Sequence, residues 1–159
     1  MNDRDIFAVW IAGAVLQGDE DEFAAEALKG LAAEASATGD LDQVLSAAAT
    51  TDRRPGDIGL DFVGPLVPVI LVGFGRLLWD AYMKALAEKG GKALADVTLS
   101  GLKELVRRTW TGENQTVRLD EAEARLLAAA SRAGLPADQA AALAASLRKP
   151  GVVVALSGG

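Results

Sequence analysis

The feature that most constrains this fold is an uncharged, apolar run in the middle of the chain. Residues 62–75 contain no charged side chain, and apolar residues continue beyond Arg76 as far as Trp79. The two prolines in the run suit the start of a helix, because proline lacks the N–H that a helix interior requires. Farther along, side chains of alternating sign recur every four residues at Arg76, Asp80, Lys84 and Glu88. The pattern predicts a long apolar helix over residues 65–89.

The apolar segment 62–79 permits three interpretations. It can be the buried central helix of a soluble bundle, since an uncharged run of this length is typical of a core helix. It can be a permanent transmembrane helix, although that requires about 20 apolar residues and the uncharged run is shorter. It can also be a conditional membrane helix, sheltered first and released later. Trp79 and Tyr82 beside Arg76 resemble the aromatic and basic anchors found at membrane interfaces.

The remainder of the chain also has a helical pattern. Alanine is abundant, aromatic residues make up 5% of the sequence, and apolar positions recur with the period of a helix. Asn2 or Asp3 can cap the first helix, and Gly39 and Gly134 suit helix ends. Besides the apolar helix, we expect helices over about 3–17, 19–38, 40–50, 92–111, 120–133 and 136–149. The predicted fold class is therefore all-α, a compact bundle of six or seven helices with a long apolar central helix.

The predicted domain organisation is one helical domain over residues 1–150. Within it we distinguish an acidic N-terminal subregion 1–54, a linker 51–59, an apolar central region 60–111 and a C-terminal helical hairpin 119–149. The linker is assigned from the sequence TDRRPGDIG, in which charged and helix-breaking residues interrupt the helical pattern.

The last residues, 151–159, are expected to form a short extended or disordered tail. Pro150 and Gly151 interrupt the preceding helix, and three consecutive valines favour a strand over a helix. The rest of the sequence offers no second strand. We therefore predict that the tail is either disordered or paired, through Val152, Val153 and Val154, with the same segment of another copy, as a self-assembly tail.

Charge is unevenly distributed along the chain. Residues 1–61 carry thirteen acidic and four basic side chains, whereas residues 62–118 carry five acidic and eight basic ones. The acidic third is either a solvated surface or a cover that shelters the basic, apolar middle until activation. The net charge of −6 argues against a nucleic-acid partner, which requires a concentrated basic surface.

The chain has no cysteine and no histidine, which excludes disulfides, thiolate metal ligands and the most common general base. The spacings of dinucleotide-binding, P-loop and EF-hand motifs are absent. We therefore expect a protein that is not an enzyme and has no catalytic residue, cofactor or metal site. The N-terminus lacks the basic and apolar regions of a secretory signal, so a cytoplasmic location is expected.

Candidate site residues follow from the membrane interpretation. The expected inserting or interface surface comprises Leu66, Val69, Ile70, Leu71, Phe74 and Trp79. The amphipathic segment 92–111 adds a partly cationic face, so the side chains expected to contact lipid headgroups are Arg76, Lys103, Arg107 and Arg108.

The order of these parts resembles that of the bacterial Bell domains and the related HeLo and mixed-lineage-kinase-like helical domains. The resemblance is carried by Phe62 to Trp79, by Gly91 to Trp110 and by the tail Val152 to Leu156. It covers about residues 50–110, matches no diagnostic motif, and departs from the family because the apolar segment is internal and the tail is short.

This resemblance implies a pore-forming or otherwise membrane-perturbing effector of bacterial cell death or immunity. Such an effector would be cytoplasmic until activation and would then associate with membrane lipids. The alternative is a soluble, non-enzymatic interaction or adaptor protein whose apolar helix forms the core or an oligomer interface with a protein partner. The sequence leaves open whether the chain forms a homo-oligomer.

Overall fold

The computed structural model describes residues 2–18, 22–51, 66–88, 97–113 and 117–158, and within these ranges its secondary structure is helical, without β-strands. This part of the chain forms eight α-helices and one 3-10 helix: α1 (Asp3–Gly18), α2 (Glu22–Thr38), α3 (Leu41–Thr51), α5 (Leu66–Glu88), α7 (Leu99–Thr111), α8 (Leu119–Arg132), α9 (Ala137–Ala145), η1 (Ser146–Arg148) and α10 (Pro150–Gly158). The predicted all-α class is confirmed. The predicted linker beyond Thr51 and the segments 60–65 and 92–96 lie outside the described residues.

Several helix boundaries follow from local capping groups. The Asn2 side chain accepts a hydrogen bond from the backbone N–H of Asp5 at 2.9 Å, at the start of α1. Thr98 does the same for Gly101 at 3.0 Å, at the start of α7. Gly39, with φ of 78°, ends α2 as the sequence predicts, and its N–H donates to the carbonyl of Ala35.

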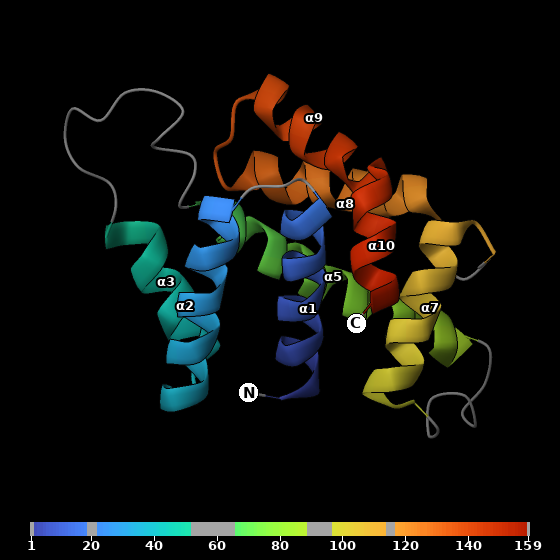
Figure 1. Cartoon of the computed structure of the whole chain (residues 1–159), viewed down its shortest axis with the longest axis horizontal. Helices are drawn as coiled ribbons and strands as arrows, with labels where there is room; N and C mark the ends of the chain where they lie inside the picture. Colours follow the sequence, from blue (N-terminus) through green and yellow to red (C-terminus); the bar gives the residue numbers. More distant parts are fainter. Residues whose placement is uncertain (1, 19–21, 52–65, 89–96, 114–116, 159) are drawn as a thin grey trace.

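Helix α1 lies in the middle of the bundle (Figure 1). It has α2 and α3 on one side and α7 and α10 on the other, and α5 crosses behind it. Accordingly, α1 is buried on most of its surface, through Phe7, Ala8, Ile11, Ala12, Ala14, Val15 and Leu16. The acidic N-terminal third therefore does not form a simple cover, because its first helix belongs to the core.

Helix α5 packs against α1, α2, α3 and α8. Its buried apolar and aromatic side chains are Ile70, Leu71, Val72, Phe74, Leu78 and Tyr82. The contact with α1 is close enough to require a glycine. A Cβ atom placed on Gly75 would lie 2.6 Å from the Cα of Ala8, so the two helix backbones touch at this point.

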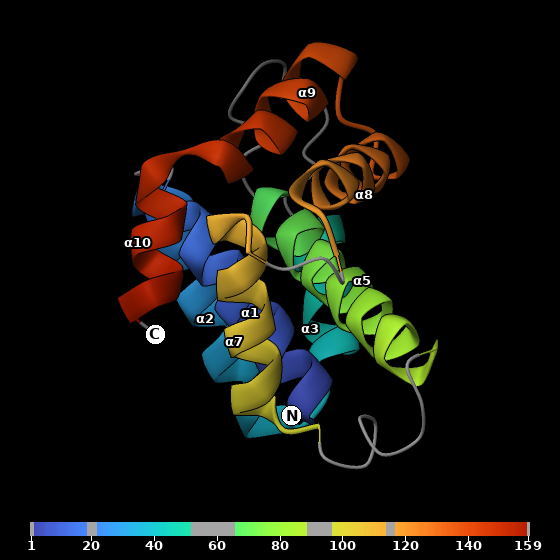
Figure 2. The ribbon, with the colours of Figure 1, turned by 90° about the vertical axis from the view of Figure 1, so that its right-hand side faces the viewer.

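Helices α8 and α9 form a hairpin at one end of the molecule, and α7 lies in front of α1 when the molecule is turned (Figure 2). Trp110, near the end of α7, donates its indole N–H to the carbonyl of Leu147 in η1 at 2.8 Å. The backbone then bends by 54° between residues 137–148 and the final helix.

The predicted extended or disordered tail is wrong, because residues 150–158 form helix α10 and dock in the bundle. Pro150 occupies the first helical position, where its missing N–H costs nothing. Val152 and Leu156, four residues apart, are 0% and 1% exposed, and α10 contacts α1 and α7. This packing outweighs the low helix propensity of the valines. Pairing of the tail as a strand with another copy loses its basis, since the helix already satisfies its backbone groups.

Candidate functional site

The most distinctive polar arrangement links α5 to two helices of the acidic N-terminal third. Arg76 donates through Nε to Asp5 Oδ1 at 3.0 Å, and its Nη1 forms an ion pair with Asp42 Oδ1. Asp5 comes from α1 and Asp42 from α3. We call these three residues the Arg76 clamp.

The Arg76 clamp is partly withdrawn from water. The side chains of Arg76 and Asp5 are 15% and 14% exposed, whereas Asp42 is 78% exposed. Burial on its own lowers the pKa of Arg76, but the hydrogen bonds to Asp42 and Asp5 and their negative charges raise it above its ordinary value. Arg76 is therefore held as a cation whose charge is balanced inside the protein.

A second charge pair lies one helical turn farther along α5. Arg4 donates to both carboxylate oxygens of Asp80, at 3.1 and 2.9 Å. Arg4 and Asp5 are adjacent on α1 and opposite in charge. They pair with Asp80 and Arg76, which are opposite in charge and one turn apart on α5. This pattern fixes how α1 and α5 are aligned, because a shifted alignment would bring like charges together.

The apolar candidates for membrane insertion are in the interior of the bundle. Ile70 is 4% exposed, and Leu71 and Phe74 are 0% exposed. Val69 is half-buried and packs against the same core. Leu66 is the first residue of α5, and its side chain lies outside the described set.

Trp79, expected as an interface anchor, is half-buried and packs edge-on against Phe7 of α1, with ring centroids 5.4 Å apart. Phe7 also contacts Trp10, at 5.9 Å between centroids. The two tryptophans thus flank one fully buried ring, and the aromatic cluster lies at the contact between α1 and α5.

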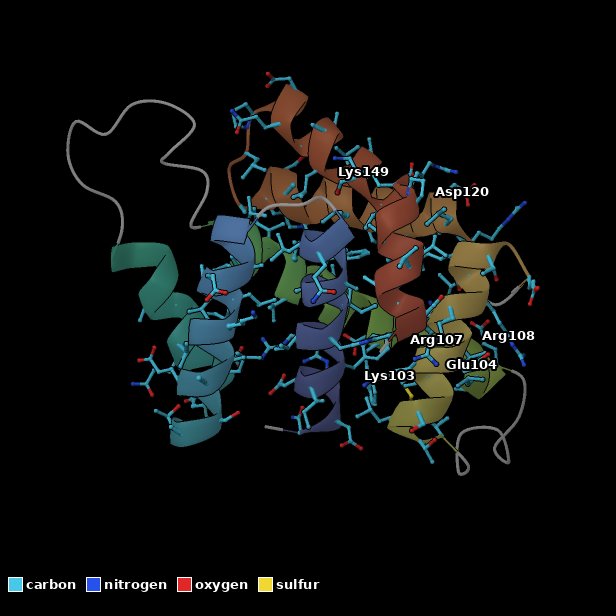
Figure 3. The ribbon with its side chains drawn as sticks, viewed as in Figure 1. Lys103, Glu104, Arg107, Arg108, Asp120 and Lys149 are labelled. Carbon is cyan, nitrogen blue, oxygen red and sulfur yellow. The ribbon has the colours of Figure 1, made fainter. Side chains whose placement is uncertain are left out.

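The expected headgroup-contacting cations of α7 make contacts within the protein (Figure 3). The Lys103 ammonium lies 5.1 Å from the centroid of the Trp10 ring, and the Arg107 guanidinium lies 6.0 Å from it. Arg107 also donates to the carbonyl of Leu156 in α10 at 2.7 Å. Arg108 is exposed, and its Nε is 4.0 Å from a carboxylate oxygen of Glu104.

A hydroxyl pair connects α5 to α7. Tyr82 is 0% exposed and its hydroxyl shares a hydrogen bond with the Thr109 hydroxyl, which itself donates to the carbonyl of Leu105. Burial raises the pKa of Tyr82, and the hydrogen bond with Thr109 offsets this only in part. Tyr82, which the sequence suggests as an interface anchor beside Trp79, is thus fully buried, and Thr109 is not a sequence-predicted site residue.

The three valines of the predicted self-assembly tail occupy different environments on α10. Val152 is buried, Val153 is half-buried, and Val154 is 70% exposed. They therefore do not form one surface.

A cavity of about 470 Å³ opens between the end of α7 and the start of α8. It is lined by Thr109, Trp110, Thr111, Gly112, Arg118, Leu119, Asp120 and Arg148, none of which is a sequence-predicted site residue. Among the described residues, no group of three or more acidic side chains is arranged to hold a metal ion.

No single described helix combines the length and the apolar character needed to cross a bilayer. The bent pair Ala137–Arg148 and Pro150–Ser157 meets the criterion when its two parts are combined, by length and composition only.

The sequence predicts Arg76 as a site residue but not its partners. The relevant signal was present, since Arg4 and Asp5 mirror Arg76 and Asp80 in charge, but it becomes specific only once α1 is known to lie against α5. Asp42 carries no such signal, because its position depends on how α3 returns to the bundle. The contact of Trp10 with the cations of α7 likewise depends on which helices pack together.

No protein-family model, no curated protein and no solved structure matches this chain.

Proposed function

We propose that this protein is a non-enzymatic helical effector that associates with membranes and perturbs them after a conformational change. Its class, an effector of bacterial cell death or immunity, is taken from the resemblance to Bell and HeLo domains. In the proposed resting state the protein is cytoplasmic, and α5 is the long apolar helix that α1, α2, α3 and α8 shelter.

The observation that carries this proposal is the Arg76 clamp. Arg76 follows the uncharged part of α5, and carboxylates of two N-terminal helices neutralise it. An arginine that loses such partners is a strong ligand for lipid phosphate, because its guanidinium binds oxyanions through paired hydrogen bonds. The clamp therefore supports a resting state in which the main cation of the apolar helix is unable to reach a membrane.

The structure favours α2 and α3 as the part that moves. Helix α1 contributes Phe7, Ile11 and other fully buried side chains, and its backbone touches α5 at Gly75. Helix α3 reaches the clamp through Asp42, an exposed side chain. Displacing the α2–α3 hairpin would uncover one side of α5 and leave the contact between α1 and α5 in place.

A leakage assay with dye-loaded vesicles containing phosphatidylglycerol tests this proposal. The variant Asp42→Asn removes one carboxylate of the clamp, and Glu34→Gln, on the exposed surface of α2, is the matched control for charge. We expect several-fold more leakage with Asp42→Asn than with the wild type or the control. The difference should shrink at 1 M salt, where screening reduces the range of attraction to anionic lipid to about 3 Å. Equal leakage from all three proteins would contradict the proposal.

The second proposed function is that of a soluble interaction or adaptor protein. The observation that favours it is the complete burial of Leu71 and Phe74 in the described state. If no variant causes leakage at any salt concentration, and Asp42→Asn remains folded, the adaptor function is the one that fits.

A further inference from the structure

We propose that the groove occupied by α10 is an interaction surface for a second copy of this chain, and that two copies associate by exchanging their α10 helices. The proposal does not depend on the membrane activity proposed above. It concerns the surfaces of α1 and α7 that α10 contacts, which together we call the α10 groove; α10 lies between these two helices (Figure 1).

The groove is shaped for this one helix. A Cβ atom placed on Gly18 of α1 would lie 2.4 Å from the backbone nitrogen of Val152. A Cβ atom placed on Gly151 of α10 would lie 2.9 Å from the carbonyl oxygen of Gly18. Glycines on both sides therefore permit the backbones to touch, and a helix without glycine at this position would not fit. The α10 helix of a second copy has glycine at this position and would therefore fit the groove.

The contacts of α10 combine apolar anchoring with polar recognition of its end. Val152 and Leu156 insert their side chains and are almost completely buried. Arg107 of α7 donates to the carbonyl of Leu156, in the last turn of α10, where helix carbonyls lack partners within the helix. These contacts would be the same whether α10 belongs to the same chain or to another.

Helix α10 also has the properties of a segment that can be exchanged. It joins the rest of the chain through Lys149, whose backbone is extended, with φ of −66° and ψ of 136° (Figure 3). Its main contacts are with α1 and α7, far from it in the sequence, while α8 and α9 pack on each other. Rotation about this connection would carry α10 to a neighbouring copy without disrupting the α8–α9 hairpin. Exchange of an identical element between copies is a low-cost route to a dimer, because the same contacts form in both arrangements.

Two full-length variants with complementary defects test the exchange. In the acceptor variant, Val152→Asp prevents α10 from docking and leaves the groove empty. In the donor variant, Gly18→Leu fills the groove at the point where α10 touches α1 and leaves α10 intact. Each variant alone should be monomeric, and an equimolar mixture should give a 1:1 heterodimer of twice the monomer mass by light scattering.

The matched control is Val154→Asp on the exposed side of the same helix, which should behave as the wild type does. A chain carrying both Val152→Asp and Gly18→Leu should not pair with the acceptor, because its own α10 is defective. The absence of a 1:1 species from the mixture, with both variants helical by circular dichroism, would overturn the proposal.

A second measurement uses the unaltered chain, in case either variant fails to fold. Light and nitrogen-15-labelled wild-type protein are mixed at high concentration, warmed towards the unfolding transition and cooled. Native mass spectrometry should then show dimers that contain one copy of each kind. A chain that remains entirely monomeric under these conditions would overturn the exchange.

Discussion

At the scale of single residues, two glycines of α5 that lie two residues apart differ in the space around them. A Cβ atom on Gly75 would collide with the backbone of Ala8, whereas a Cβ atom on Gly73 would have no neighbour within 4 Å. We expect Gly75→Ala to lower the free energy of unfolding by about 1–3 kcal/mol through overpacking. Gly73→Ala should raise it by about 0.5–1 kcal/mol, because alanine favours the helix. Urea unfolding of both variants checks this, and equal effects would show that α1 and α5 do not touch at Gly75.

Also at the scale of single residues, Tyr82 makes the free energy of unfolding depend on pH. It is the single tyrosine of the sequence, and burial raises its pKa above the ordinary value of 10.0. Above that pH the unfolded chain releases the phenol proton while the folded chain retains it, so stability falls as pH rises. Tyr82→Phe should remove this component of the slope while costing about 0.5–1.5 kcal/mol at neutral pH for the lost hydrogen bond. Urea midpoints of both proteins between pH 8 and about 11 measure the difference, and parallel curves would contradict the raised pKa.

At the scale of elements, α10 shows where sequence patterns lose their predictive power. Valines favour strands on average, yet Val152 is buried in a helix and Val154 is 70% exposed on it. We expect Val152→Ala to destabilise the protein by about 1–3 kcal/mol through the cavity it leaves. Val154→Ala should be neutral or stabilise by up to about 0.5 kcal/mol through helix propensity. Thermal unfolding compares the two, and equal losses would argue against a docked helix.

At the scale of the whole molecule, α1 is the part of the acidic N-terminal third that packs into the core of the bundle. Deleting residues 1–54 removes seven buried side chains of α1 together with the carboxylate partners of Arg76. We therefore expect the truncated chain to lose cooperative unfolding and to bind a hydrophobic dye in solution, as partly folded chains do. Circular dichroism and dye fluorescence measure both. A truncated chain that unfolds cooperatively would show that α1 is a detachable cover after all.

The parts of the fold that the sequence predicts are those governed by local patterns. Asn2, Gly39 and the apolar period of α5 mark helices correctly because capping and periodicity act within one or two turns. The role of Gly18 and the partners of Arg76 depend on which helices cross, and that information is distributed over the whole chain. The prediction of an extended tail is wrong because the strand propensity of its valines is weaker than the packing of Val152 and Leu156.

The positions of the three tryptophans have a spectroscopic consequence. Trp79 lies at the contact of α1 with α5, Trp10 at that of α1 with α7, and Trp110 at that of α7 with η1. The protein therefore carries a separate indole resonance at each of three helix contacts. In a nitrogen-15 correlation spectrum, displacement of α7 would move the signals of Trp10 and Trp110 and leave that of Trp79 in place. Separation of α1 from α5 would instead move the Trp79 signal, so the native sequence reports which contact opens first without an introduced probe residue.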